Sequence, residues 1–297
     1  MSSVIFRVNG RYQHRIRFGE TATLIQACYF RGKELGYDDI YMEWPLKSMF
    51  SDIYGNRINI KCPPNELLPI KFIHRLEFNK YQYNKNVGLD EYNSFYKDSP
   101  PVFEKNKTCF IGFYSFLNKY YLETGKKPIF NIKKDKLDKP YIIFHFRWSN
   151  NHSPERNPRV SSYMKIFNMI KEKYGNKYEI WKSGEPNKML ERKCDKTIPY
   201  YNDNLNEQIK VINNSSLVVS PGCGIEAYCE LVDKPLLYVE ASQDNIGGTF
   251  DKQWWKNNGG KHGEMLQEWR IGDRLHVLWK QNEVDRDEIF KFMDRWL

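Results

Sequence analysis

The sequence predicts two α/β domains that face each other across a cleft, with a doubly wound parallel sheet in the second. Short apolar runs alternate with amphipathic helical segments between residues 141 and 240, a pattern typical of a parallel sheet covered by helices on both faces. The 297 residues suffice for two domains of ordinary size. The charged segment "NIKKDKLDKP" (131–140) is the best linker candidate. We therefore expect domains at residues 1–135 and 136–297.

The second half has a regular order of elements. Strands are expected at 141–146, 177–184, 217–220 and 235–240, and helices at 160–175, 204–216 and 224–232. The segment 284–297 places Ile289, Phe292, Met293 and Trp296 at helical spacing, so we expect a last helix that docks on the domain.

The first half is less regular. A strand is expected within 3–10, a helix over 21–36 that ends at a glycine, a strand over 38–43 and a helix over 113–125. Residues 44–108 are rich in Tyr, Asn, Lys and Pro, and few elements are expected there.

Composition indicates a folded protein of the cytoplasm. The chain is 40% hydrophobic and 15% aromatic, which excludes a disordered chain. No run reaches the roughly 18 apolar residues of a membrane helix, and the first twenty residues lack the apolar centre of a signal peptide. The six cysteines form no CxxC pair, so we expect reduced thiols and neither disulfides nor a zinc site.

The net charge of +9 is concentrated in the first half. Residues 1–139 hold 23 Lys and Arg against 15 Asp and Glu, whereas residues 140–297 hold 23 against 22. This excess favours an anionic partner, such as an acidic glycan, a phosphorylated lipid or peripheral contact with a membrane surface. A solvated, lysine-rich surface is the alternative. No zinc-finger or RNA-recognition signature is present, and no nucleic acid is expected.

Ligands of parallel sheets bind beyond the carboxyl ends of the strands, and three predicted turns occupy that position. The first follows "YIIFHF" and carries His145, Arg147 and Asn150. The planar guanidinium of arginine suits phosphate oxygens. An ordinary surface loop, with His145 as a core residue, is the alternative.

The second turn follows "KYEIW" and carries Lys182, Ser183 and Gly184. A small, flexible turn there can approach a nucleotide base or ribose. A plain turn between a strand and a helix explains these residues equally well.

The third turn joins an apolar strand to a helix through small residues. Its members are Ser220, Pro221, Gly222, Cys223, Gly224, Ile225 and Glu226. The two glycines leave backbone N–H groups at the helix N-terminus open to an anion, aided by the helix dipole. Glu226, one turn into the helix, can accept hydrogen bonds from a ribose. Neither the P-loop pattern nor the dinucleotide-binding G-x-G-x-x-G pattern is present.

Residues 218–239 resemble the nucleotide-sugar half of GT-B glycosyltransferases. They contain, in order, an apolar strand, a small-residue turn, a helix with Glu-Ala, "KP" and a second apolar strand. The heptosyltransferase-like group is the most similar, and "IWKSGEP" resembles its Gly-Gly-x-x-Glu turn. "FHFR" is similar to the His-x-Arg of O-fucosyltransferases, whose arginine contacts the donor phosphate. The resemblance covers residues 15–40 and 141–240 in pattern, implies two Rossmann-like domains, and leaves residues 41–140 unmatched.

The same resemblance suggests a catalytic residue. The segment "RFGETATLIQACYFRGKELG" is similar to the first loop and helix of these families. In heptosyltransferases this loop contains Gly-Asp, and the aspartate is the catalytic base. The corresponding pair in this sequence is Gly19-Glu20. The Gly-x-Gly-Asn of fucosyltransferases is absent. Glu20 is therefore the expected base, with a helix-start carboxylate as its structural alternative. Asp38, Asp39 and the His145 turn are the other places to search.

The expected function is transfer of a sugar from a nucleotide diphosphate sugar to a hydroxyl of a glycan or lipid-linked acceptor, with inversion and without a cofactor. Alternatives are a sugar-nucleotide epimerase of the same shape and a non-catalytic protein that binds glycans or anions. A metal-dependent transferase would need Asp-x-Asp after an apolar strand. The only such triplet, at residues 285–287, opens the last helix, where capping explains it better. No metal is expected.

Overall fold

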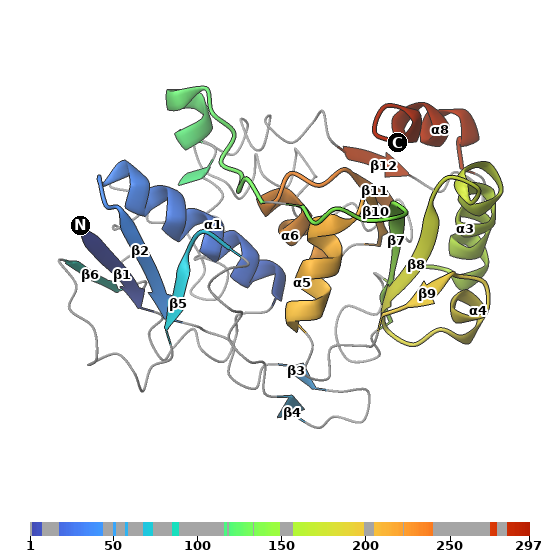
Figure 1. Ribbon diagram of the computed structural model, residues 1–297, viewed down its shortest axis with the longest axis horizontal. Helices are drawn as coiled ribbons and strands as arrows, with labels where there is room; N and C mark the ends of the chain where they lie inside the picture. Colours follow the sequence, from blue (N-terminus) through green and yellow to red (C-terminus); the bar gives the residue numbers. More distant parts are fainter. Residues whose placement is uncertain are drawn as a thin grey trace, which may run out of the picture. The chain divides into compact units, whose positions relative to one another are not determined.

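The computed structural model contains two α/β units (Figure 1). One unit comprises Met1–Ile132 and Gly248–Ile271, and the other comprises Lys133–Gly247 and Gly272–Leu297. The residues described are 2–7, 18–43, 50–51, 57–58, 68–73, 85–88, 116–117, 119–132, 134–148, 157–198, 205–221, 223–239, 274–277 and 284–297. No described helix combines the length and the apolar character needed to span a bilayer.

The first unit is built on a parallel sheet with the order β5-β2-β1-β6. Its elements are β1 (Ser3–Arg7), α1 (Phe18–Glu34), β2 (Asp39–Glu43), β3 (Phe50–Ser51), β4 (Arg57–Ile58), β5 (Lys71–Ile73) and β6 (Lys85–Gly88). β3 and β4 pair separately as an antiparallel ribbon. Helix α1 begins three residues before the expected start at Thr21. Residues 116–117 and 119–124 are helical, within the helix expected at 113–125.

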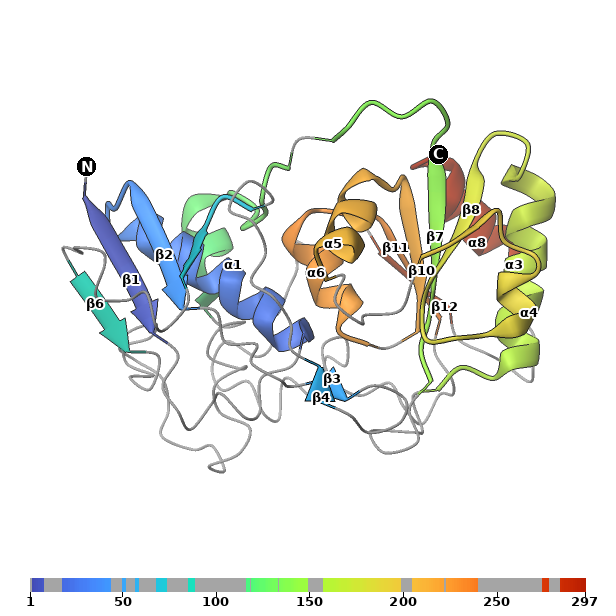
Figure 2. The ribbon, with the colours of Figure 1, turned by 60° about the horizontal axis from the view of Figure 1, so that its bottom comes forward.

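The second unit is built on a parallel sheet with the order β12-β11-β10-β7-β8-β9. Its strands are β7 (Tyr141–Phe146), β8 (Glu179–Gly184), β9 (Lys196–Thr197), β10 (Leu217–Ser220), β11 (Leu236–Val239) and β12 (Arg274–Val277). Its helices are α3 (Val160–Tyr174), α4 (Lys188–Glu191), α5 (Leu205–Asn214), α6 (Ile225–Leu231) and α8 (Arg286–Asp294). This is the strand order of the Rossmann fold, in which the sequence of strands reverses beside the first one. The sheet is doubly wound, with α5 and α6 on one face and α3, α4 and α8 on the other (Figure 2).

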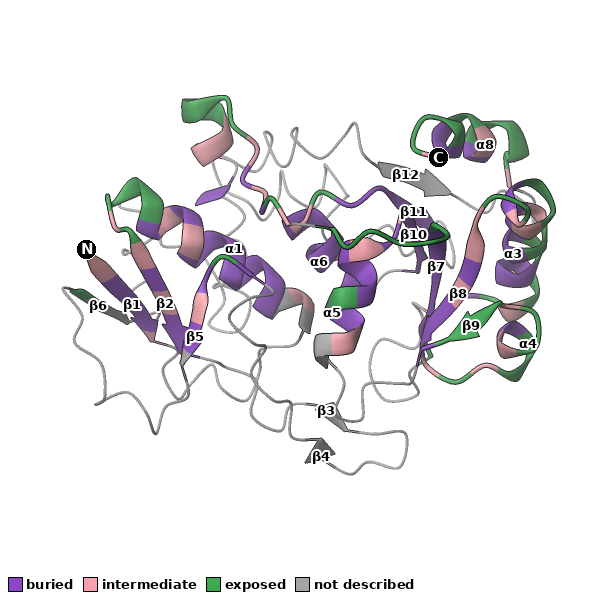
Figure 3. Cartoon of the chain, in the orientation of Figure 1, coloured by how far each residue is buried: buried purple, intermediate pink, exposed green. Residues whose placement is uncertain are grey.

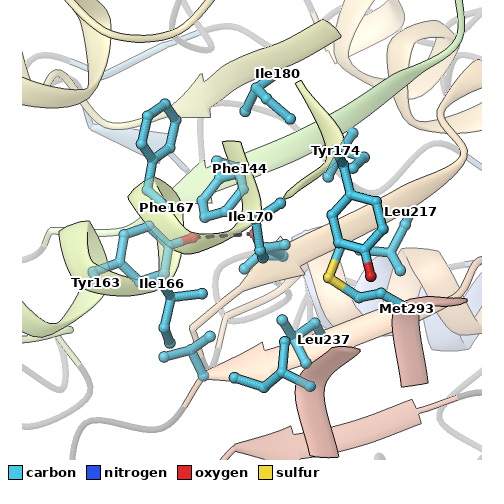
Figure 4. Close-up of a cluster of buried hydrophobic side chains, with 14 of the residues drawn as sticks. Phe144, Tyr163, Ile166, Phe167, Ile170, Tyr174, Ile180, Leu217, Leu237 and Met293 are labelled. Carbon is cyan, nitrogen blue, oxygen red and sulfur yellow. Dashed lines mark hydrogen bonds between the residues drawn. The ribbon is translucent and has the colours of Figure 1, made fainter. Parts of the chain in front are cut away.

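A continuous apolar core lies between the sheet and α3 (Figures 3 and 4). Ile142, Phe144 and Phe146 of β7 belong to this core together with Phe167 of α3. Because side chains alternate along a strand, His145 must point to the opposite face of the sheet, where α5 and α6 lie. The core thus determines which face of the sheet the polar residues of β7 reach.

The last helix docks on this core as expected. Ile289, Phe292 and Met293 of α8 are buried, but Trp296 follows the helix end and is 36% exposed, so its expected place on the docking face was wrong. The Asp285 carboxylate accepts a hydrogen bond from the Glu288 amide at 3.0 Å. This contact confirms that the acidic triplet opens the helix, with Asp285 as its cap.

Candidate functional site

The strand order of the second sheet reverses between β7 and β10, and the two strands diverge there. Their pairing ends at Phe144 and Val219. By contrast, β7 stays paired with β8 as far as Phe146, and β10 stays paired with β11 as far as Ser220. Open α/β sheets bind ligands in the crevice at such a reversal point, beyond the carboxyl ends of the strands. The three predicted turns follow β7, β8 and β10, and therefore meet at this edge.

His145, near the end of β7, is buried and neutral. Its Nδ1 lies 3.0 Å from the Ser183 hydroxyl on the neighbouring strand. Burial lowers the pKa of His145 to about 3, and the positive charges of Lys182 and Arg147 act in the same direction. A neutral imidazole cannot offer positive charge to a phosphate, so in this structure His145 connects the ends of β7 and β8.

Arg147 follows β7 directly and is 9% exposed. Its Nη1 donates a hydrogen bond of 2.9 Å to the Asn157 side-chain oxygen, which lies just before α3. Burial raises the pKa of the Cys223 thiol, and the positive charge of the Arg147 guanidinium opposes this rise. The Arg147 charge at the end of β7 therefore acts on the turn that follows β10.

The second turn is held by an ion pair whose lysine is buried. Lys182 is 2% exposed, and its ammonium donates to the Glu191 carboxylate at 3.1 Å and to the Gly184 carbonyl at 3.2 Å. Burial lowers the pKa of Lys182, and the contact with Glu191 opposes this. Burial alone would raise the pKa of Glu191, but the Asn187 amide and the Lys182 ammonium together lower it. Lys182 thus supports the turn in this structure, and its expected contact with a nucleotide stays a prediction.

Gly184 cannot be replaced without strain. Its φ of 80° lies in the left-handed region, where residues with a side chain are disfavoured. An added Cβ would lie 2.2 Å from the Phe146 carbonyl oxygen and 2.9 Å from the His145 ring. The glycine therefore lets the second turn pack directly against the end of β7.

The third turn is compact and carries an unionised thiol. The Ser220 hydroxyl is buried, donates to the Pro221 carbonyl at 2.8 Å and lies 3.2 Å from the Cys223 sulfur. Burial raises the pKa of Cys223 to about 11, against the opposing effects of Ser220, the Ile225 amide and Arg147. A neutral thiol adds no negative charge to the turn, which already carries the Glu226 carboxylate in the first turn of α6.

The start of α6 lies at the same edge. Gly224 precedes the helix with helical backbone angles and no side-chain cap, Ile225 is buried, and Glu226 occupies the first turn. Glu226 is partly buried. The helix thus begins at the crevice, as the sequence predicted.

Three predicted residues lie wholly or partly outside the described residues. Asn150 and Gly222 lie outside the described residues, and the side chain of Glu20 does too, although its backbone is in α1. Because α1 begins at Phe18, Glu20 is the third residue of the helix and not the residue before it. A carboxylate there still interacts favourably with the helix dipole.

The lysine of the "KP" pair has a structural role. Lys234 is 3% exposed and donates to the carbonyl oxygens of Asn213, at 3.0 Å, and Ser215, at 2.5 Å. These carbonyls lie at the end of α5, where backbone acceptors lack helical partners. Lys234 therefore terminates α5 and precedes β11, at the amino edge of the sheet opposite the crevice.

Sequence reasoning missed three side chains that shape this edge: Tyr163, Asn157 and Glu191. The Tyr163 hydroxyl contacts the carbonyl oxygens of both His145 and Val219, at 2.8 and 3.1 Å. No motif marks these residues in the sequence. The only available signal was that each lies on, or just before, a helix that follows a strand of the site.

Comparison with known proteins defines the class of fold. No model of a known protein family matches the sequence, and no curated protein does either. Among solved structures, E. coli heptosyltransferase WaaC with ADP aligns over 100% of both chains, with a TM-score of 0.52 and 10% sequence identity. The same enzyme with ADP-2-deoxy-2-fluoro heptose aligns over 99% of both chains, with a TM-score of 0.52 and 9% identity.

A glycosyl transferase family 9 protein from Veillonella parvula DSM 2008 aligns over 100% of this chain and 90% of its own, with a TM-score of 0.50 and 10% identity. The chain therefore has a GT-B fold of two Rossmann-like units, which confirms the predicted fold class. More narrowly, its architecture is heptosyltransferase-like, as the sequence resemblance implied.

Proposed function

We propose that this protein is a glycosyltransferase that moves a sugar from a nucleotide diphosphate sugar to a hydroxyl of a glycan or lipid-linked acceptor. The observation that carries the proposal is the divergence of β7 and β10, with Arg147 on one side and residues 220–225 on the other. The similar E. coli enzyme was solved with ADP and with an ADP-sugar analogue. A crevice of the same fold, lined by an arginine and a helix start, suits a diphosphate.

Charge stabilisation is the main contribution of this edge to the reaction. When the sugar leaves, negative charge grows on the nucleotide diphosphate. Arg147 and the backbone amides at the start of α6 are held in place before the reaction, so they stabilise that charge without reorganising. This mechanism requires no metal ion, and activity is expected to persist in a chelator.

Donor binding tests this proposal. A panel of nucleotide diphosphate sugars is compared by thermal shift, and at about 100 times Kd the matching donor should raise Tm by roughly 5–10 °C. Arg147→Gln should weaken donor binding at least tenfold. Arg159→Gln is the matched control, because Arg159 is exposed just before α3. This variant should bind the donor as tightly as the wild-type protein does. A panel without any stabilisation would favour a protein that only binds glycans or other anions.

Glu20 is the proposed base that removes the proton of the acceptor hydroxyl in an inverting transfer. Glu20→Gln should lower turnover by about 10²- to 10⁴-fold and leave donor affinity nearly unchanged. Glu34→Gln, at the other end of α1 where Glu34 pairs with Arg31, is the control and should keep normal turnover. Turnover of Glu20→Gln within about threefold of wild type would leave Glu20 as a dipole-stabilising residue only.

The other acids considered from the sequence are poorly placed for this role. Asp38 precedes β2 and Asp39 begins it, so both lie at the amino edge of the first sheet. Asp38 also accepts a hydrogen bond from the Ser2 amide, and Asp39 from Lys71. If Glu20 fails, Glu43 is the better candidate, because it ends β2 at the carboxyl edge and is 3% exposed.

The acceptor is proposed to be anionic, because the positive charge of the chain is concentrated in residues 1–139. Acceptor binding should then weaken as salt screens the surface charges. A sugar-nucleotide epimerase would instead alter the sugar or release free nucleotide with no acceptor present, so product analysis without acceptor separates the two activities.

A further inference from the structure

At the edge where β7 and β10 diverge, one hydroxyl group among the described residues touches both strands. Tyr163 of α3 is 1% exposed, and its hydroxyl lies 2.8 Å from the His145 carbonyl oxygen and 3.1 Å from the Val219 carbonyl oxygen. Val219 is the last residue of β10 that pairs with β7, and His145 is the first residue of β7 beyond that pairing. The hydroxyl therefore lies where the ladder between the two strands stops.

Ring packing holds this hydroxyl in place. The Tyr163 ring packs edge-on against Phe144, with centroids 5.8 Å apart, and at a tilt against Phe146, with centroids 6.0 Å apart. Burial raises the pKa of Tyr163 well above its usual value, and nearby Cys223 adds to the effect. The group therefore stays protonated, and its one hydrogen is shared between the two carbonyl oxygens in a three-centre hydrogen bond.

We propose that Tyr163 is a positioning residue for the diphosphate site, because its hydroxyl sets the separation between the ends of β7 and β10. This inference rests on the proposed donor site. Arg147 lies two residues beyond His145, and Ser220 is the next residue after Val219. A residue of a strand spans about 3.3 Å, so any change in the spacing of the two carbonyls passes almost directly to Arg147 and to the 220–225 turn. Groups that stabilise developing charge need this fixed geometry.

Tyr141 provides a matched control on the same strand. It begins β7, is 2% exposed, and its hydroxyl donates to the Val211 carbonyl at 2.7 Å. Tyr163→Phe and Tyr141→Phe thus each remove one buried hydroxyl that bonds backbone carbonyl oxygen. Only Tyr163 lies at the carboxyl edge of the sheet, and Tyr141 lies at the amino edge.

Both variants are compared by calorimetric titration with the donor that stabilises the wild-type protein, and by steady-state kinetics. Tyr163→Phe should raise the donor Kd and KM about tenfold and lower kcat less, because the groups that contact the donor remain but lose their spacing. Tyr141→Phe should keep the donor Kd within about twofold, despite a similar loss of Tm. Equal donor affinity in the two variants would overturn the inference. If Tyr163→Phe does not fold, both variants are compared in trimethylamine N-oxide, which favours folded states.

Hydrogen exchange on the ligand-free protein separates this inference from the proposed function. Tyr163→Phe should speed exchange in peptides covering 143–148 and 217–221, whereas Tyr141→Phe should leave those peptides unchanged. If the wild-type protein binds no sugar nucleotide, the proposed function is wrong, and faster exchange at both strand ends still supports the spacing role of Tyr163. Unchanged exchange at both strand ends contradicts it whatever the ligand proves to be.

Discussion

Replacing Lys182 with methionine should destabilise the second unit far more than the same replacement at Lys171. Each lysine bonds one carboxylate, at 3.1 Å in both cases, and one backbone carbonyl. Their burial differs greatly. The side chains of Lys182 and Glu191 are 2% and 31% exposed, whereas those of Lys171 and Asp195 are 36% and 38% exposed. The pair of variants therefore isolates the effect of burial.

The expected size of the effect follows from the lost contacts. A hydrogen bond to a charged group contributes about 1.5–3 kcal/mol, so the two bonds of Lys182 contribute about 3–6 kcal/mol before other effects. Methionine avoids the cost of burying an ammonium, which is several kcal/mol. Water can also reach the partly exposed Glu191 carboxylate. We therefore expect Lys182→Met to cost about 2–3 kcal/mol and Lys171→Met to cost about 0–1 kcal/mol.

Hydrogen exchange of peptides from β7 and β8, measured along a urea series, gives the unfolding free energy of this unit. Salt at about 1 M, where the Debye length is about 3 Å, should remove the small cost of Lys171→Met and leave that of Lys182→Met. Equal costs for the two variants, or equal sensitivity to salt, would refute the argument that burial makes the Lys182 contacts strong.

Two further outcomes are expected. Gly184→Ala should cost about 3 kcal/mol or more in urea unfolding, since it combines a left-handed φ with a Cβ placed 2.2 Å from the Phe146 carbonyl. Gly36→Ala is the control, because its φ of 81° is also left-handed but nothing lies within 4 Å of the added Cβ, and it should cost only about 1–2 kcal/mol. Equal losses of stability in the two variants would contradict the argument that the Cβ of Gly184→Ala clashes with Phe146. The His145 pKa of about 3 lies below the usual 6.5, so the unfolded state binds more protons between these pH values and stability should fall as pH drops through that window. Between pH 7 and pH 5, His145 should lower the free energy of unfolding by roughly 2 kcal/mol, and His145→Gln should lack this loss. An identical pH dependence in the wild type and the variant would show that His145 is not held neutral.

Much of the second unit could be predicted because its local signals are strong. Strands β7 and β10 have the expected bounds, and α3, α5, α6 and β11 differ from the expected ranges by only one or two residues at either end. β9 was missed because its two residues, Lys196 and Thr197, are both polar and give no apolar signal. Its place in the sheet comes from pairing with β8. α4 was missed because it is a single turn, whose start depends on the Asn187 side chain accepting amide bonds.

The site was only partly predictable for a different reason. Arg147 and the 220–225 turn follow apolar strands directly, so their place at the carboxyl edge is implied by the order of elements. The direction of a side chain depends on contacts that no short pattern contains. Lys182 turns to Glu191, nine positions along the chain, and Tyr163 reaches Val219, 56 positions away. Supporting residues of this kind become visible only when the packing of α3 and α4 on the sheet is known.

The division of the chain into units has a consequence for its synthesis on the ribosome. After β11 the chain contributes residues 248–271 to the first unit, and only then returns to add β12 and α8 to the second. The segment between Val239 and Arg274 takes about 2–7 s to translate at roughly 5–20 residues per second. During that interval the fully apolar strand "LLYV" has no neighbour on its outer edge, and an unpaired apolar edge invites pairing with other chains. Slow translation through this region should therefore favour aggregation of the nascent protein, and holdase chaperones that cover apolar edges should raise its soluble yield.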